Sequence, residues 1–204
     1  MEKTFTVFIV DDDARVIKAL SRLLLMKGYH VQSYTSPHEF LANHDATVPG
    51  CAILDVAMPG LDGLELQQAL TIGGSHRPVI FLSGKGDIPT SVRAMKAGAI
   101  DFLTIPMSNQ HLLAAIARAQ EQDAKTRQMD AELASIAAKI ATLTPRQREV
   151  LAHVAAGRLN KQIASDLGTV ENTIKFHRGA MMKKLGVSTV ADLVRMAEKA
   201  GISK

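Results

Sequence analysis

The chain has 204 residues, of which 47% are hydrophobic and 22% charged, a composition typical of one or two globular domains. It contains no run of about 18 uncharged apolar residues, which excludes a membrane-spanning segment. The apolar stretch near the N-terminus leads directly into three aspartates, so we expect no secretory signal and a cytoplasmic protein. The single cysteine, Cys51, excludes an internal disulfide framework and a cysteine-based zinc site.

The net charge of +4 is unevenly distributed along the chain. Residues 1–122 carry 10 Lys/Arg against 12 Asp/Glu, residues 123–139 carry 3 against 3, and residues 140–204 carry 11 against 5. A basic C-terminal segment is typical of a module that binds a polyanion. Nucleic acid is the first candidate, because neutralised phosphates release counterions and so favour binding.

Residues 1–122 alternate apolar strand segments with segments of helical periodicity. We predict strands at Thr4–Val10, His30–Tyr34, Cys51–Leu54, Val79–Leu82 and Ile100–Leu103. We predict helices at Ala14–Lys27, Pro37–Asn43, Leu64–Leu70 and Ile88–Ala97, and a long one from Asn109. Ser36, Asp87 and Ser108 precede three of these helices as N-caps. This alternation indicates an α/β domain whose parallel sheet is covered by helices on both faces.

Polar residues follow the predicted strands. Asp11, Asp12 and Asp13 come after the first strand, Asp55 after the third and Ser83 after the fourth. The carboxyl ends of parallel strands meet at one edge of a sheet, so we expect these side chains to converge. Clustered carboxylates repel one another unless a cation lies between them, and such oxygen ligands suit Mg²⁺. Asp13 by itself is interpreted as a helix N-cap.

Residues 5–120 resemble the receiver domain of two-component response regulators. The matching segments are the Asp11-Asp12 pair and the stretches LDVAMPGLDG, FLSG and AMKAGAIDFL. The resemblance implies a flavodoxin-like, doubly wound five-stranded parallel sheet.

The resemblance also implies roles for individual residues. Asp55 would accept a phosphoryl group from a sensor histidine kinase. Asp12, Asp55 and the backbone carbonyl of Ala57 would ligate Mg²⁺ directly, and Asp11 would act through water. Ser83 would bond a phosphoryl oxygen. Phe102 fills the aromatic switch position, although a simple core position explains an aromatic residue there equally well.

One position departs from the receiver pattern. Receivers carry a lysine before the proline that follows the fifth strand, and Ile105 stands there in this chain. Either phosphorylation is weak or absent, or another cation substitutes. Lys85, two residues after Ser83, is the candidate for such a catalytic cation, and an exposed loop lysine is the alternative interpretation of the same residue.

The segment 123–141 contains no glycine or proline and has balanced charge, which predicts a helical linker. Apolar residues recur within it at spacings of three and four. A short coiled-coil contact between two chains is one interpretation, and packing against the neighbouring domains is favoured because the repeat is not clean.

Residues 142–204 predict an all-α bundle of four short helices. Thr144, Pro145 and Gln147 together give an N-cap, a proline at the first helical position and a capping-box glutamine. Further helices are predicted at about 160–167, from 171 to 185, and after residue 188. The short connection Gly168-Thr169-Val170 between the second and third helices is typical of a helix-turn-helix.

This segment resembles the LuxR-type DNA-binding domain of the NarL/FixJ subfamily of response regulators. The matching stretches are LTPRQREVL, GRLNKQIASDLG, NTIKFHRGAMMKKLGV and ADLVRMA. The resemblance implies that the major groove is faced by Lys175, Phe176, Arg178 and Gly179. It implies that backbone phosphates are approached by Thr144, Arg146, Lys161, Thr173 and His177. Glu149 is interpreted as structural, paired with Arg178 or another basic residue.

Two of these residues leave alternatives open. Gly179 costs roughly 1 kcal/mol inside a helix relative to alanine, and it either allows a close backbone approach to DNA or removes one base contact. Phe176 either touches thymine methyl groups or packs in a half-buried position.

The leading hypothesis is a DNA-binding transcriptional regulator that acts as a homodimer at promoter DNA and is switched by Mg²⁺-dependent phosphorylation of Asp55. Such a protein is not an enzyme, although a receiver promotes its own phosphorylation and dephosphorylation. The first alternative, which rests on Ile105, is a DNA-binding dimer that works without phosphorylation. The second is a D-x-D phosphohydrolase with Asp11 as nucleophile and Asp13 as acid, which leaves Asp55 and the basic tail unexplained.

Overall fold

The computed structural model describes residues 4–85 and 87–202. The chain divides into two compact units, residues 1–127 and 128–204, which we describe separately. Within the described residues, every helix is too short or too polar to cross a lipid bilayer.

The N-terminal unit contains a five-stranded sheet in which every neighbouring pair is parallel. Its strands are β1 (Thr6–Val10), β2 (His30–Tyr34), β3 (Gly50–Asp55), β4 (Val79–Ser83) and β5 (Asp101–Thr104). They lie side by side in the order β2-β1-β3-β4-β5. This doubly wound arrangement confirms the predicted fold class.

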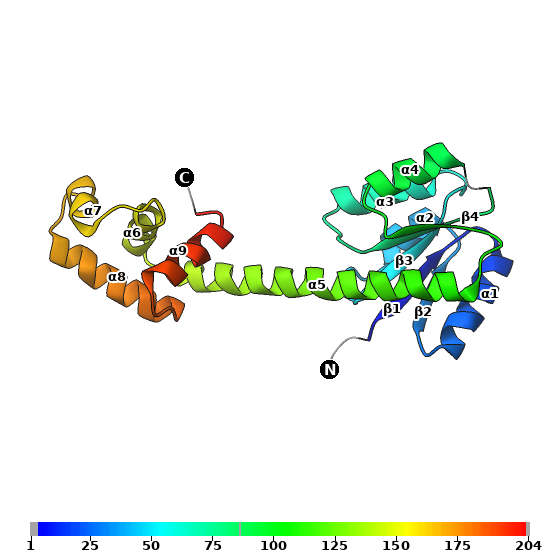
Figure 1. The fold of residues 1–204 in the computed structure, drawn as a ribbon, viewed down its shortest axis with the longest axis horizontal. Coiled ribbons are helices and arrows are strands. Elements are labelled where there is room, and N and C mark those ends of the chain that lie inside the picture. Colours follow the sequence, from blue (N-terminus) through cyan, green and yellow to red (C-terminus); the bar gives the residue numbers. More distant parts are fainter. Residues whose placement is uncertain (1–3, 86, 203–204) are drawn as a thin grey trace. The chain divides into compact units, whose positions relative to one another are not determined.

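Helices cover both faces of this sheet (Figure 1). They are α1 (Ala14–Met26), α2 (Pro37–Asn43), α3 (Gly63–Ile72), α4 (Ile88–Lys96) and the long α5 (Asn109–Ala141). Successive side chains of β1 point to opposite faces of the sheet, as strand geometry requires. Val7 and Ile9 pack with residues of α1 and α5, whereas Phe8 and Val10 pack with residues of α2, α3 and α4. The central strands are therefore buried on both sides.

The helix starts follow the predicted capping chemistry. The side chains of Asp13, Ser36 and Asp87 accept backbone N–H bonds at the starts of α1, α2 and α4, and Ser108 accepts one from His111 in α5. The predicted boundaries of β1 and β5 were wrong by one or two residues. Strand β5 begins at Asp101 because that residue, rather than Ile100, is in register with Ile80 of β4.

The C-terminal unit is the predicted helical bundle. It comprises the end of α5 together with α6 (Pro145–Ala155), α7 (Asn160–Asp166), α8 (Glu171–Leu185) and α9 (Val190–Lys199). Thr144 and Gln147 form the predicted capping box at the start of α6. Ile140 at the end of α5 packs against the core of this unit, and Glu132 forms an ion pair with Lys199 of α9 at 2.5 Å.

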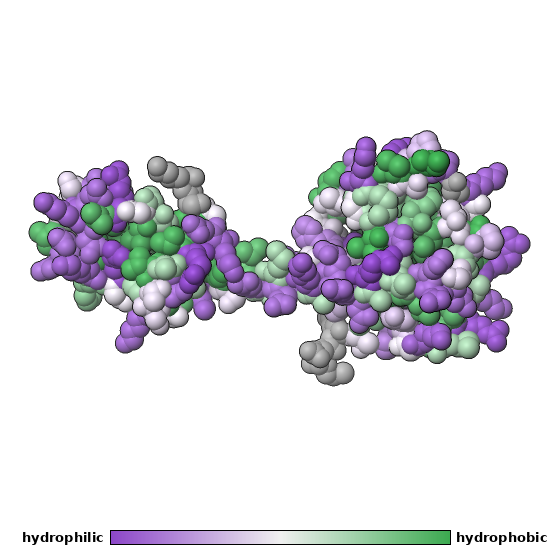
Figure 2. Space-filling view, viewed as in Figure 1, coloured by the Kyte–Doolittle hydropathy of each residue, from purple (hydrophilic) through white to green (hydrophobic). Residues whose placement is uncertain are grey.

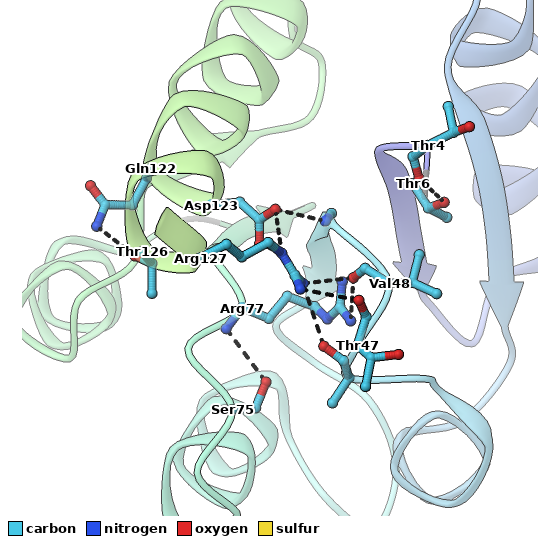
Figure 3. A network of polar contacts seen from close by, with 12 residues as sticks. Thr4, Thr6, Thr47, Val48, Ser75, Arg77, Gln122, Asp123, Thr126 and Arg127 are labelled. Atoms are coloured by element: carbon cyan, nitrogen blue, oxygen red, sulfur yellow. Dashed lines mark hydrogen bonds and ion pairs between the residues drawn. The ribbon is translucent and has the colours of Figure 1, made fainter. Parts of the chain in front are cut away.

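The predicted linker 123–141 is helical throughout, as part of α5. Its first residues contact the N-terminal unit at the amino ends of the strands (Figure 3). The buried Asp123 carboxylate accepts a bond from the Gly50 amide at 3.2 Å and pairs with Arg127 at 2.9 Å. Arg127 also donates to the carbonyls of Thr47 and Val48, and Arg77 donates to that of Val48. The domain boundaries at 122 and 142 stay predictions.

Candidate functional site

The carboxyl ends of four adjacent strands place the predicted phosphorylation residues in a row. The pairing of Val10 with Leu54 sets Asp11, just after β1, beside Asp55 at the end of β3. The pairing of Asp55 with Leu82 brings Ser83, the last residue of β4, to the same edge of the sheet. Ile105 follows β5 directly and donates its amide hydrogen to the Ser83 carbonyl at 2.9 Å.

Asp11 and Asp55 lie in an environment that disfavours their charged forms. Burial and, to a lesser extent, the neighbouring carboxylates of Asp55 and Asp12 raise the pKa of Asp11 to about 6, against a bond from the Asp13 amide at 2.8 Å that lowers it. Burial also raises the pKa of Asp55, although its carboxylate accepts a bond from the Ala57 amide at 2.9 Å. These acids therefore form one electrostatically coupled group.

The donor chemistry of this group fits a hard divalent cation. Carboxylate and carbonyl oxygens are the ligands that Mg²⁺ prefers, and mutual repulsion of the acids favours a positive ion between them. In the described part of the chain, no three acidic, histidine or cysteine side chains gather closely enough to hold a metal ion by themselves. The predicted acids Asp11, Asp12 and Asp55 are thus not gathered into a closed three-carboxylate site, and metal binding stays a prediction.

Ser83 and Lys85 lie together at the end of β4. Ser83 is buried, and its hydroxyl oxygen accepts the Lys85 amide hydrogen at 3.2 Å. The Lys85 side chain is exposed. The Ile105 side chain is partly exposed at the end of the next strand, where it offers neither charge nor hydrogen-bond donor.

Phe102 is half-buried on β5, and its ring lies 6.2 Å from that of Phe81 between centroids. It packs against the core that α2, α3 and α4 cover. This contact supports the interpretation as a core aromatic, and the switch role stays a prediction.

Sequence reasoning missed the start of α3. Asp62 and Glu65 form a capping box there, a pattern that the spacing of an N-cap acid and a glutamate three residues later indicates. A Cβ atom on Gly63 would stand 2.2 Å from the Asp55 carbonyl oxygen and 3.1 Å from the Phe81 ring. Only glycine allows this helix to approach the strand that ends in Asp55 so closely.

The helix-turn-helix consists of α7 and α8, as predicted. Helix α8 buries Ile174, Met181 and Leu185 against the core of its unit. Its opposite side exposes residues spaced three or four apart, which share one helix face. We call this the α8 face, and it consists of Asn172, Lys175, Phe176, Gly179 and Lys183.

Several residues predicted to approach DNA also have partners within the protein. Arg178 donates to the Asn160 side chain at the start of α7. Arg146 pairs with Glu149 at 2.8 Å and donates to the Leu167 carbonyl at 2.7 Å, so Glu149 pairs with this arginine and not with Arg178.

The remaining DNA-binding candidates differ in exposure. Thr144 is exposed and caps α6, and Lys161 is exposed on α7. Thr173 and His177 are half-buried on α8.

Comparison with known proteins supports the predicted resemblance of both parts of the chain. Residues 7–117 match the response regulator receiver domain, and residues 141–197 match the bacterial regulatory proteins of the luxR family. The chain is 43% identical over 197 residues to nodulation protein W of Bradyrhizobium diazoefficiens, covering 97% of this chain and 87% of that protein.

Two solved structures of response regulators are similar to almost the whole chain. The response regulator StyR is 41% identical with a TM-score of 0.82 and covers 96% of this chain and 99% of its own. Full-length FixJ from B. japonicum is 36% identical with a TM-score of 0.59, covering 99% of each chain. Taken with the acidic strand ends and the helix-turn-helix, these matches establish that the chain belongs to the NarL/FixJ-type response regulators, DNA-binding transcriptional regulators in which a receiver domain precedes a LuxR-type domain.

Proposed function

We propose that a sensor histidine kinase phosphorylates Asp55 and that this modification controls the binding of the C-terminal unit to promoter DNA in the cytoplasm. The observation that carries the proposal is the coupled group of Asp11, Asp12 and Asp55, with the buried Ser83 hydroxyl at the same edge of the sheet.

The residues of this edge have separate tasks in the proposed reaction. An Asp55 carboxylate oxygen forms the new bond to phosphorus, while the bond from phosphorus to the donor's histidine nitrogen breaks and its electron pair returns to the ring. The Ser83 hydroxyl donates its proton in a hydrogen bond to a phosphoryl oxygen.

Asp11, Asp12, Asp55 and the Ala57 carbonyl would hold Mg²⁺. The ion would supply charge neutralisation for the transferring group.

The reaction is tested with a small acyl-phosphate donor and Mg²⁺, followed by mass spectrometry. The wild type should gain one phosphoryl group on Asp55, and Asp55→Asn should gain none. Phosphate on Asp11 instead would contradict this proposal and favour the phosphohydrolase alternative.

We propose that Lys85 supplies the positive charge that is missing because Ile105 stands at the position of the usual receiver lysine. Its amide already bonds to Ser83, so its exposed side chain starts from a backbone position next to the site. Lys85→Ala should lower the yield of phosphorylated Asp55 far more than Lys96→Ala, which removes an exposed lysine from α4. Equal yields in the two variants would reject this role.

A second function is favoured by Ile105 itself. Without a cation at this position, the receiver would work as a dimerising module, and DNA binding would be independent of phosphate. Under this alternative, phosphodonor leaves DNA binding of the wild type unchanged.

DNA is proposed to lie against the α8 face. Lys175, Phe176, Arg178 and Gly179 would face the major groove. Backbone phosphates would be approached by Thr144, Arg146, Lys161, Thr173 and His177. Base-reading residues determine which sequence is preferred, whereas phosphate-binding residues contribute to every sequence. Lys175→Ala should therefore change the preferred sequence, and a uniform loss of affinity would reject its base-reading role.

A homodimer is proposed because one recognition helix reads only a few base pairs. Ile88, Val92 and Met95 form an exposed apolar stripe on α4, and Figure 2 shows hydrophobic surface at the top of the N-terminal unit, where this helix lies. Such a stripe is suited to contact with a second copy.

A further inference from the structure

The Phe176 side chain is 72% exposed on α8, although it is the largest apolar residue of that helix. Among the described aromatic rings, its neighbour is His177, with ring centroids 6.0 Å apart. The core residues of α8 lie on its other side. The ring therefore contributes little to packing within the unit, and its exposure requires another explanation.

Gly179 lies one helical turn after Phe176 on the same face. A Cβ atom there would meet nothing within 4 Å, so no contact inside the protein requires a glycine. A glycine in a helix interior nevertheless costs roughly 1 kcal/mol relative to alanine. The folded unit therefore leaves the helix backbone at Gly179 open to the approach of a partner.

The surroundings of these two residues indicate the chemistry of that partner. Lys175 and Lys183 flank them on the α8 face, in a segment with a net charge of +6. An apolar ring within a cationic row matches the major groove of DNA, whose one apolar group is the 5-methyl of thymine. Lys175 pairs with Glu171 at 3.2 Å, and a purely hydrophobic partner surface would remove this exposed pair and the Lys183 ammonium group from water.

We propose that Phe176 reads thymine by packing on its 5-methyl group, and that Gly179 leaves the space in which that base pair approaches α8. This inference rests on the proposed placement of the α8 face in the major groove. It adds a specificity determinant that does not depend on phosphorylation.

The test begins with selection of preferred sites from random DNA by the full chain, with and without phosphodonor. Each thymine of the selected site is then replaced by deoxyuridine, which removes the methyl group and keeps the base-pairing hydrogen bonds. Wild-type affinity should fall about fourfold when the thymine of one half-site is replaced and about fifteenfold when those of both half-sites are, since each replacement removes one buried methyl group. Phe176→Ala should bind the thymine and deoxyuridine sites equally.

Two further variants distinguish the proposed contact with thymine from a general effect on folding. Val190→Ala removes a partly exposed apolar side chain from α9, and it should keep the wild-type sensitivity to deoxyuridine. Gly179→Ala should leave the melting temperature unchanged or higher, since its Cβ meets open space, yet weaken binding to the selected site.

The inference is overturned if no deoxyuridine weakens wild-type binding, or if the same deoxyuridine effect persists in Phe176→Ala. Unchanged affinity of Gly179→Ala would overturn the role of the glycine. If selection enriches no sequence, sequence-specific DNA binding itself fails and this inference fails with it. Enrichment without a deoxyuridine effect rejects only the thymine contact.

Discussion

At the scale of single residues, the acidic group at the ends of β1 and β3 opposes folding of the metal-free protein. Asp11 is buried beside Asp55 and Asp12, and its pKa is raised to about 6. Folding therefore favours the protonated form of Asp11, and the ionised form reduces stability. A cation between the carboxylates would reverse this effect, so the proposed magnesium binding should stabilise the N-terminal unit.

The first prediction concerns Asp11→Asn without magnesium. Because the folded pKa of Asp11 exceeds its usual 3.8, wild-type stability relative to the variant is greatest below about pH 4 and falls as pH rises through about 6. The variant should exceed the wild type by up to about 3 kcal/mol at pH 7.5.

This difference is measured by thermal unfolding at several pH values. Magnesium should stabilise the wild type more than the variant. A difference that does not change with pH would show that Asp11 ionises normally in the folded protein.

The second prediction concerns Gly63→Ala. The new Cβ would stand 2.2 Å from the Asp55 carbonyl oxygen, which is backbone, so α3 or the end of β3 must shift. We expect a loss of about 1–3 kcal/mol in the free energy of unfolding, typical of overpacking, and a lower yield of phosphorylated Asp55.

Gly84→Ala is the control for stability, since its Cβ would meet nothing within 4 Å. Equal stability of Gly63→Ala and the wild type would contradict the close approach of α3.

At the scale of elements, the strand and helix pattern was predictable because it depends on local signals. Apolar runs, N-caps and the Thr144 capping box lie within a few residues of the structure they determine. The site acids were predictable for the same reason, since strand ends in a parallel sheet converge. The contact of Asp123 with the Gly50 amide was not predictable, because 73 residues separate the partners and nothing local marks the pair.

Exposure and intramolecular pairing on α8 were also beyond sequence reasoning. The resemblance to LuxR-type domains grouped Lys175 with Arg178 in the major groove, but Arg178 is half-buried and bonded to Asn160 of α7. Tertiary contacts decide which of several neighbouring helix residues remain accessible. The exposure of the Phe176 ring and the open space beside Gly179 likewise depend on tertiary packing.

The third prediction concerns the attachment of α5 to the N-terminal unit. Asp123→Ala leaves the Gly50 amide without its acceptor and Arg127 without its carboxylate, and should cost about 2–4 kcal/mol. Chemical denaturation measures the loss. Glu121→Ala, at an exposed position of the same helix, should change stability little. A similar small effect in both variants would show that this buried network is unimportant.

At the scale of the whole molecule, the two units differ in net charge and in proposed function. The acidic N-terminal unit carries the proposed phosphorylation site, and the basic C-terminal unit carries the helix-turn-helix. Helix α5 contributes residues to both units without a break in the described structure. A phosphoryl group adds charge of about −2 with strong acceptor oxygens at Asp55, a local change able to bias a surface between two states.

The fourth prediction concerns the salt dependence of DNA binding. Lys161 is exposed on α7, and its proposed contact is a backbone phosphate. Lys161→Ala should weaken all sequences alike and reduce the slope of log affinity against log salt by about one per bound copy. Titrations of selected and unrelated DNA at several salt concentrations measure this. A change of sequence preference with an unaltered slope would reject a phosphate contact.

The central claim is that phosphorylation of Asp55 controls DNA binding. The most direct test is a protection experiment on selected DNA, with and without phosphodonor and Mg²⁺, for the wild type and Asp55→Asn. Phosphodonor should change the protein concentration needed for protection by the wild type and leave that of Asp55→Asn unaltered. If both proteins needed the same concentration for protection, with and without donor, the claim would be contradicted. That result would favour a regulator that works without phosphate.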